Sequence, residues 1–251
     1  RKEHNNGNLN NARKIKNDEF YTHMSDIDNG LQHYKEHFSG KTVLCNCDDP
    51  RVSNFFHYFS FNFEALGLKK LITTCYKNQE RDFFSKNECD QAVYLEYEGD
   101  KNGNHIPDAE EIGVKPLKGD GDFRSAECIE LLKQADVVVT NPPFSLFKEF
   151  VKVLMDNNKD FIILGNMNAI TYKEVLPYIK ENKIGLGYLN GAKSFITPDG
   201  VEQKFGNIFW YTTLPIAKHN EELILYKHYT PEEYPKYDNY DAINVDKTCD
   251  I

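Results

Sequence analysis

The stretch DVVVTNPPF at residues 136–144 decides the fold expected for this chain. Its run of three valines favours a strand that is buried on both faces, as in a parallel sheet. The two prolines end that strand, because proline lacks the backbone N–H that a sheet requires and has a fixed φ. Apolar residues then recur at helical spacing over residues 146–155. The sequence therefore predicts a buried strand, a rigid turn and an amphipathic helix.

The turn in this stretch combines residues suited to holding a planar amino group. The side-chain oxygen of Asn141 and the carbonyl of Pro142 are two hydrogen-bond acceptors, and Phe144 offers a flat ring for stacking. Such a site orients the nitrogen lone pair toward an electrophile, as methylation of an exocyclic amine requires. Asn141, Pro142 and Phe144 are therefore the candidate catalytic residues, and Asn141, Pro143 and Phe144 the candidate contacts of the target base. The alternative is a simple strand-ending turn with a buried phenylalanine.

Strand and helix patterns alternate on both sides of this stretch. Strands are expected at residues 41–47, 71–75, 92–98, 114–118, 136–140, 161–164, 183–189, 194–197, 207–213 and 223–229. Helices are expected at residues 31–38, 52–66, 126–133, 146–155 and 172–180. This alternation predicts right-handed βαβ units and an α/β fold: a mostly parallel sheet with helices on both faces. The closing strands predict an antiparallel edge.

The expected organisation is one catalytic domain with two flanking segments. Residues 1–16 are polar and rich in Asn and Lys, which predicts a flexible N-terminal arm. The catalytic domain is expected at residues 17–230. Residues 231–251 have no clear period and are interpreted as a C-terminal extension that is truncated.

Composition narrows the function only modestly. The 251 residues include 30 Lys and Arg against 39 Asp and Glu, and a net acidic chain is a modest argument against nucleic acid as a partner. The six cysteines form no CxxC pair, and no apolar stretch is long enough to span a bilayer. Residues 100–108 have some resemblance to a calcium loop, but histidine replaces the required glycine, so we expect a hairpin turn and no metal site.

Three loops are expected to share the rim of the sheet where parallel strands end, which is where open α/β sheets bind ligands. They are residues 46–50, 119–123 and 141–144. A methyl donor such as S-adenosylmethionine presents a cationic end, a ribose and an adenine. Asp48 and Asp49 suit the methionine or ribose part; Asp122 can accept a hydrogen bond from the adenine amine, beside Phe123. The alternative interpretation of residues 119–123 is a solvated turn without a binding role.

The chain resembles the EcoRI-type family of adenine-specific DNA methyltransferases. The matching segments are residues 17–22, 43–50, 119–125, 141–144, 165–170 and 204–208. The resemblance implies a class I, Rossmann-like methyltransferase fold with S-adenosylmethionine as the donor. It also implies that the acceptor is the N6 amine of adenine in a defined site of double-stranded DNA, in a restriction–modification or phage setting. The expected location is the cytoplasm of a bacterium or of a phage-infected cell.

The resemblance also implies roles for the residues that match its motifs. Tyr21 and Thr22 would lie at the edge of the donor pocket, and Asn46 would lie against the donor with Asp48 and Asp49. Asp122 and Phe123 would hold its adenine, and residues 141–144 the target base. The chain departs from common methyltransferases in two places: residues 46–50 replace the glycine-rich loop, and no acidic residue follows the second strand. The ribose would then contact Tyr76 or Asp48.

Two other functions stay open at this point. A glutamine-N5 methyltransferase uses the same Asn-Pro-Pro-aromatic turn on an amide, and a non-catalytic subunit could bind DNA or donor without turnover. DNA contacts are expected among the lysines near the turn, which could equally be solvated surface charges. These candidates are Lys148, Lys152, Lys173, Lys193 and Lys204. Residues 190–195 are a candidate wall for the target base. The sequence does not indicate an oligomeric state.

Overall fold

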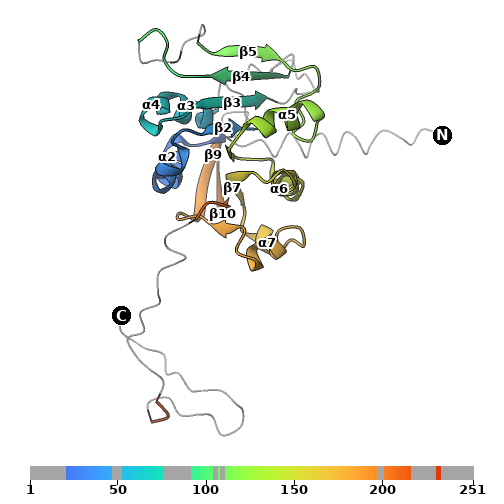
Figure 1. Cartoon of the computed structure of the whole chain (residues 1–251). Helices are drawn as coiled ribbons and strands as arrows, with labels where there is room; N and C mark the ends of the chain where they lie inside the picture. The colour runs from blue at the N-terminus through green and yellow to red at the C-terminus, as the bar shows by residue number, and fades with distance from the viewer. Residues whose placement is uncertain are drawn as a thin grey trace, which may run out of the picture. The chain divides into compact units, whose positions relative to one another are not determined.

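The computed structural model of the chain describes residues 21–46, 53–75, 92–103, 107, 111–196, 201–215 and 230–232 (Figure 1). Its strands are β1 (Tyr21–Thr22), β2 (Thr42–Cys45), β3 (Lys70–Cys75), β4 (Val93–Tyr97), β5 (Gly113–Pro116), β6 (Val137–Thr140), β7 (Asp160–Asn166), β8 (Gly185–Leu186), β9 (Gly191–Ile196) and β10 (Glu202–Thr212). Its α-helices are α2 (Met24–Leu31), α3 (Asn54–Phe61), α4 (Phe63–Leu66), α5 (Ala126–Gln134), α6 (Phe147–Asp156) and α7 (Leu176–Lys180). Three 3₁₀ segments complete the described elements: η1 (Gln32–Phe38), η2 (Phe144–Leu146) and η3 (Met167–Thr171).

The described strands form a single mixed sheet in the order β1-β9-β10-β7-β6-β2-β3-β4-β5, with β8 beside β10. Strands β3, β2, β6 and β7 are parallel and form its centre. Both flanks are antiparallel: β4 and β5 continue from β3, whereas β10, β9 and β1 continue from β7. The α/β fold with a parallel centre is thus confirmed, and the antiparallel part extends further than the predicted single edge.

Each central strand contributes alternate residues to two hydrophobic cores, one on each face of the sheet. In β2, Val43 and Cys45 face one core and Leu44 faces the other; in β6, Val139 and Val138 divide in the same way. This follows from the two-residue period of a strand. Because both faces are buried, these strands read as continuous apolar runs.

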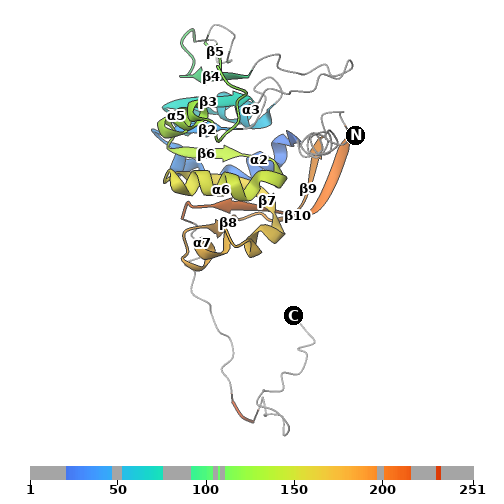
Figure 2. The same ribbon diagram turned by 90° about the vertical axis from the view of Figure 1, so that its right-hand side faces the viewer.

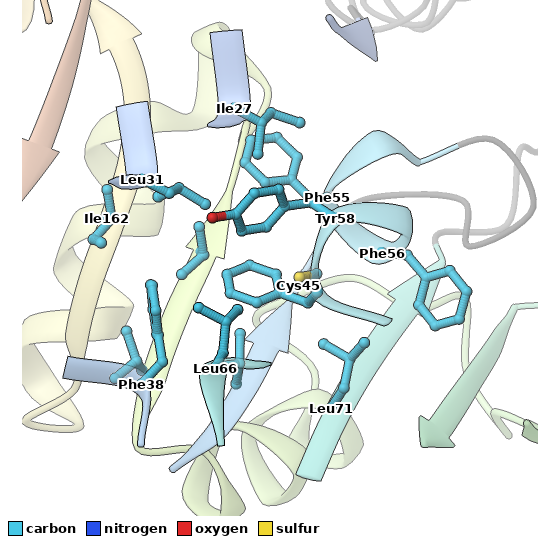
Figure 3. Packing of buried hydrophobic residues seen from close by; sticks show 14 of the residues in the cluster. Ile27, Leu31, Phe38, Cys45, Phe55, Phe56, Tyr58, Leu66, Leu71 and Ile162 are labelled. Carbon is cyan, nitrogen blue, oxygen red and sulfur yellow. The ribbon is translucent and has the colours of Figure 1, made fainter. Parts of the chain in front are cut away.

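Different helices cover the two faces (Figures 1 and 2). Helices α2, α3 and α4, with η1, supply the core that contains Val43 and Cys45, and Figure 3 shows Ile27, Phe55 and Leu66 packed there. Helices α5 and α6 supply the other core, which the residues around α7 extend. Because the helices cover the two faces, the ends of the central strands form the rim of the sheet.

Several local details differ from the sequence prediction for physical reasons. The helix expected at residues 52–66 is divided into α3 and α4 at Asn62, whose side-chain amide donates to the carbonyl of Tyr58. Its predicted stop is correct: Gly67 has a φ of 62°, a left-handed conformation that glycine adopts without strain. The strand expected at 183–189 is reduced to β8, and the strand expected at 223–229 lies outside the described residues.

The chain divides into two compact units, residues 1–216 and residues 217–251. The whole sheet belongs to the first unit, and residues 230–232 are the described part of the second. The proposed arm at residues 1–16 and most of the extension at 231–251 lie outside the described residues. Within the described ranges, none of the helices is both long and apolar enough to cross a bilayer.

Candidate active site

Hydrogen bonds between strand ends place two of the predicted loops on the same rim. The hydroxyl of Thr140, at the end of β6, donates to the backbone carbonyl of Asn46, directly after β2. The hydroxyl of Thr74, near the end of β3, donates to the side-chain oxygen of Asn46. All three residues are buried. Asn46 therefore links the ends of β2, β3 and β6. Thr140, which binds Asn46, is followed directly by Asn141.

The Asn-Pro-Pro-Phe turn begins inside the protein and ends near its surface. Asn141 and Pro142 are buried, whereas Pro143 and Phe144 are half-buried. The backbone N–H of Leu146 donates to the carbonyl of Pro143 at 3.0 Å and closes the 3₁₀ turn η2 before α6. This arrangement confirms the strand–turn–helix order predicted from the sequence. Phe144 is half-buried and packs against the hydrophobic core, so it differs from the fully buried phenylalanine of the alternative interpretation only in its partial exposure.

The ring of Phe144 lies against two phenylalanines of the β9–β10 hairpin. Its centroid is 6.2 Å from that of Phe195 and 6.3 Å from that of Phe205, both edge-on. Phe195 and Phe205 contact each other at 5.6 Å. The predicted wall at residues 190–195 therefore lies beside the turn through Phe195. Phe205 was missed by the sequence analysis, although its segment, 204–208, was among those that carried the family resemblance.

Strand β1 brings the N-terminal candidates to the same hairpin. Thr22 pairs with Phe195 and Tyr21 with Ile196 in an antiparallel register. The carbonyl of Thr22 accepts a hydrogen bond of 2.7 Å from the amide of Asn54. The hydroxyl oxygen of Thr22 is buried and has no hydrogen-bond partner among the described residues. A polar atom in this state suits a bound polar ligand, because burial without a partner costs free energy.

The predicted acidic loop is held in shape by Arg124. Both carboxylate oxygens of Asp122 accept from the Arg124 guanidinium, at 2.9 and 2.6 Å. These hydrogen bonds lower the pKa of Asp122 below its usual value, and burial opposes them. The carboxylate therefore stays ionised and, with about four acceptor positions, retains capacity for a further donor. The backbone carbonyl of Asp122 accepts from Ser125, the N-cap of α5.

Phe123 is more deeply placed than the sequence indicated. Its ring is buried in the core and contacts Phe150 of α6 edge-on at 5.0 Å. The Arg124 guanidinium lies over the ring, 5.2 Å from its centroid. A donor adenine could stack only on the part of the Phe123 ring that Phe150 and Arg124 do not cover. The stacking role of Phe123 therefore stays a prediction. The remaining donor candidates, Asp48, Asp49 and Tyr76, lie outside the described residues.

In the turn with some likeness to a calcium loop, side-chain oxygens accept hydrogen bonds from backbone N–H groups of the same segment. A carboxylate oxygen of Glu111 accepts from the N–H groups of Lys101 and Asn102, at 2.6 and 3.1 Å. A side-chain oxygen of Asp100 accepts from Gly103 at 2.6 Å. The described part of the segment therefore fits the hairpin-turn interpretation. Residues 104–106 and 108–110 lie outside the described ranges.

The candidate DNA-contacting lysines differ sharply in environment. Lys148 and Lys204 are exposed, Lys152 pairs with Asp156 at 2.6 Å, and Lys173 is 3.9 Å from Glu174. Lys193 is instead buried, with 7% of its surface exposed. Lys193 was expected to be either a DNA contact or a solvated surface charge, and its burial corrects the second expectation.

The central strands are parallel, helices cover both faces of the sheet, and antiparallel β10 lies beside β7. Together with the Asn-Pro-Pro-Phe turn after β6, this arrangement defines a class I methyltransferase domain. Comparison with known proteins agrees. The chain belongs to the family described as adenine-specific methyltransferase EcoRI, whose model matches residues 8–251. It is therefore a site-specific, adenine-specific DNA methyltransferase, which confirms the enzyme class expected from the sequence. As such it uses a methyl donor.

Three curated relatives are similar over nearly the whole chain. The type II methyltransferase M.EcoRI of Escherichia coli is 49% identical over 97% of this chain and 80% of its own length. M.MpnI of Mycoplasma pneumoniae is 38% identical over 97% of the chain and 76% of its own length. A type II methyltransferase of Mycoplasma genitalium is also 38% identical, over 97% and 77%. These relatives support the expected restriction–modification setting. No solved structure matches the chain.

Proposed function

We propose that the chain transfers the methyl group of S-adenosylmethionine to the N6 amine of an adenine in double-stranded DNA, at the turn formed by residues 141–144. One observation carries the proposal: Asn141 follows Thr140, whose hydroxyl is bonded to Asn46, so the candidate target-base and donor loops share one rim. The half-buried ring of Phe144 beside Phe195 and Phe205 supports an aromatic site for the base.

Asn141 and Pro142 act on the target amine. The two N–H groups of the amine donate to the side-chain oxygen of Asn141 and to the carbonyl of Pro142. This shifts the nitrogen toward sp³ character and aims its lone pair at the methyl carbon. The acceptors also stabilise the positive charge that develops on the nitrogen. Alignment of the reactants supplies much of the acceleration, and no covalent enzyme intermediate is needed. An adenine in duplex DNA must be flipped out to reach Phe144.

The residues near the rim fit an S-adenosylmethionine molecule. When bound, that donor supplies an electrophilic methyl group on a sulfonium. In this proposal the ionised Asp122 accepts from its adenine amine, and a polar group of the donor meets the Thr22 hydroxyl, which is buried without a partner among the described residues. Tyr21 and Asn46 line the same region in this proposal, with Asp48, Asp49 and Tyr76 assigned by resemblance. The bacterial cytoplasm, where such DNA lies, stays the expected location.

The test is incubation of the purified chain with labelled S-adenosylmethionine and unmethylated genomic DNA, followed by nucleoside analysis and mapping of the modified site. We expect label in N6-methyladenine at one recurring sequence. Label in glutamine of a release factor, with none in DNA, would support the glutamine-N5 alternative. Donor binding by calorimetry with no transfer to DNA or protein would support a non-catalytic subunit.

A further inference from the structure

A buried lysine lies beside the proposed target-base site and is not used by the mechanism above. Lys193 is on β9, paired directly with Phe205 of β10. Directly paired residues place their side chains on the same face of the sheet, as do residues two apart on one strand. Lys193 therefore shares a face with Phe205 and Phe195, the two rings that contact Phe144. Figure 2 shows β9 and β10 running together.

The position of Lys193 is costly for a cation. Its side chain is more than nine-tenths buried, and it forms no hydrogen bond or ion pair among the described residues. Burial lowers its pKa, and Asp26, in the first turn of α2, opposes that shift by its negative charge. Burying a lysine without a hydrogen-bond partner opposes folding. A ligand that accepts a hydrogen bond there would offset this cost.

The surroundings of Lys193 select the part of the DNA that could reach it. A phosphate of the duplex backbone lies on the outside of the DNA, whereas Lys193 is 7% exposed and lies among aromatic side chains, an environment that suits a base better than a phosphate. The neighbouring side chains on its face are aromatic, and the same rings form the wall beside Phe144. The edge of a base carries ring nitrogens that accept hydrogen bonds. Such an edge matches both the aromatic walls and the donor.

We propose that Lys193 is a binding residue for the flipped adenine, whose Nζ donates a hydrogen bond to one ring nitrogen of the base. Asn141 and Pro142 hold the exocyclic amine, and Lys193 fixes the orientation of the ring. This proposal rests on the proposed function. It adds a polar contact to the base that neither the turn nor the donor loops provide.

The experiment uses single-turnover methylation of duplexes that contain the mapped recognition sequence. The target adenine is replaced in turn by 1-deaza-, 3-deaza- and 7-deazaadenine, each of which lacks one ring acceptor. We expect one analogue to slow the wild-type enzyme by about 10- to 100-fold, the usual effect of a hydrogen bond from a charged group. Lys193→Met should slow methylation of normal DNA by a similar factor, with no further loss on that analogue. Electronic effects of the analogue are common to both enzymes, so their ratio isolates the contact.

Lys204→Met is the matched control, because Lys204 is exposed on β10 and pairs with Ser194. It should weaken duplex binding at most and leave the discrimination among analogues as in the wild type. The proposal is overturned if none of the three analogues slows the wild type, a result that does not depend on how well any variant folds. It is also overturned if Lys193→Met is slowed by the same analogue as strongly as the wild type. A third contrary result is that methylphosphonate substitution of flanking phosphates slows the wild type but slows Lys193→Met no further, because Lys193 would then contact a phosphate. In each case the wild type still methylates adenine, so the proposed function survives.

Discussion

At the scale of single residues, Asn46 shows how a site can be fixed by groups that do no chemistry. Its side-chain oxygen accepts from Thr74 and its backbone carbonyl from Thr140. A buried polar group with its hydrogen bonds satisfied has little freedom to move. The contact predicted between Asn46 and the methyl donor would therefore involve a side chain that Thr74 already holds in place. The same bonds hold the residue that precedes Asn141.

Asn141→Ala should remove an acceptor that is used most strongly when charge develops on the target nitrogen. We expect single-turnover methylation to fall by about 100-fold or more, the range seen when one such electrostatic partner is removed. Donor affinity measured by calorimetry should change little, because Asn141 contacts the acceptor in this proposal. Full activity in the variant would mean that the base is held elsewhere.

Asp122→Ala should weaken donor binding first. Loss of a hydrogen bond to a charged acceptor raises the dissociation constant of S-adenosylmethionine by about tenfold or more. Since the pKa of Asp122 is lowered by the Arg124 hydrogen bonds, wild-type affinity should stay constant as pH falls to about 4, the usual value for Asp. Arg124→Gln removes these hydrogen bonds and raises the pKa of Asp122, so the affinity of that variant should begin to decrease at a higher pH than in the wild type. Unchanged calorimetric affinity in Asp122→Ala would exclude the assigned role.

At the scale of elements, the sequence predicted what local chemistry decides. The buried strand at 136–140, the stop at Gly67 and the apolar stripe of α6 follow from valine runs, glycine and helical spacing, and all are present. These local patterns do not indicate which distant segments pair with one another in the sheet. The antiparallel β4–β5 flank depends on Glu96, whose carboxylate binds Lys70 of β3 and Lys115 of β5. No local pattern specifies such a contact.

Glu96→Gln tests this link between β3, β4 and β5. Burial raises the pKa of Glu96, but the hydrogen bonds and charges of Lys115 and Lys70 outweigh it, so the net shift is downward. The stabilisation is then present above the unfolded pKa of about 4.3 and is lost as pH falls through the folded value. We expect the variant to melt about 2 °C lower at pH 7, with the difference vanishing in acid. Glu130→Gln, which removes an exposed pair with Lys133, should have a smaller effect at every pH.

Gly30→Ala tests the packing of α2 on the sheet. Alanine favours a helix over glycine by up to about 1 kcal/mol. A Cβ at this position, however, would lie 2.5 Å from Cε2 of Trp210, a fully buried residue of β10. Overpacking of this kind costs about 1–3 kcal/mol, so denaturant unfolding should show net destabilisation. The exposed neighbour Asn29→Ala, in the same helix, should be neutral or stabilising.

At the scale of the whole molecule, the candidate site combines segments that are far apart in the chain. Three segments meet there because the sheet order places β1 and β9 beyond β10: the turn at 141–144, strand β1 with Thr22, and the hairpin of β9 and β10. The sequence predicted the turn and the loop at 190–195 separately. It could not show that Phe205 completes the contact or that Lys193 is buried, because cross-strand register decides both. The enzyme class could thus be predicted from sequence motifs, whereas the side chains that surround the candidate site depend on the fold.

Phe205→Ala asks whether that long-range wall matters for function. Its ring contacts Phe144 and Phe195, so truncation should loosen the aromatic site for the base while leaving the donor loops intact. We expect kcat/KM for DNA to fall by about tenfold, in line with the 1–3 kcal/mol that a stacking aromatic contributes per base in single-stranded DNA binding. Calorimetric affinity for S-adenosylmethionine should be retained. Phe61→Ala removes an exposed phenylalanine of α3 that lies against His57 and should leave both measurements unchanged. If Phe205→Ala instead lowers donor affinity and leaves DNA kinetics intact, the hairpin belongs to the donor pocket and the wall assigned to the target base is wrong.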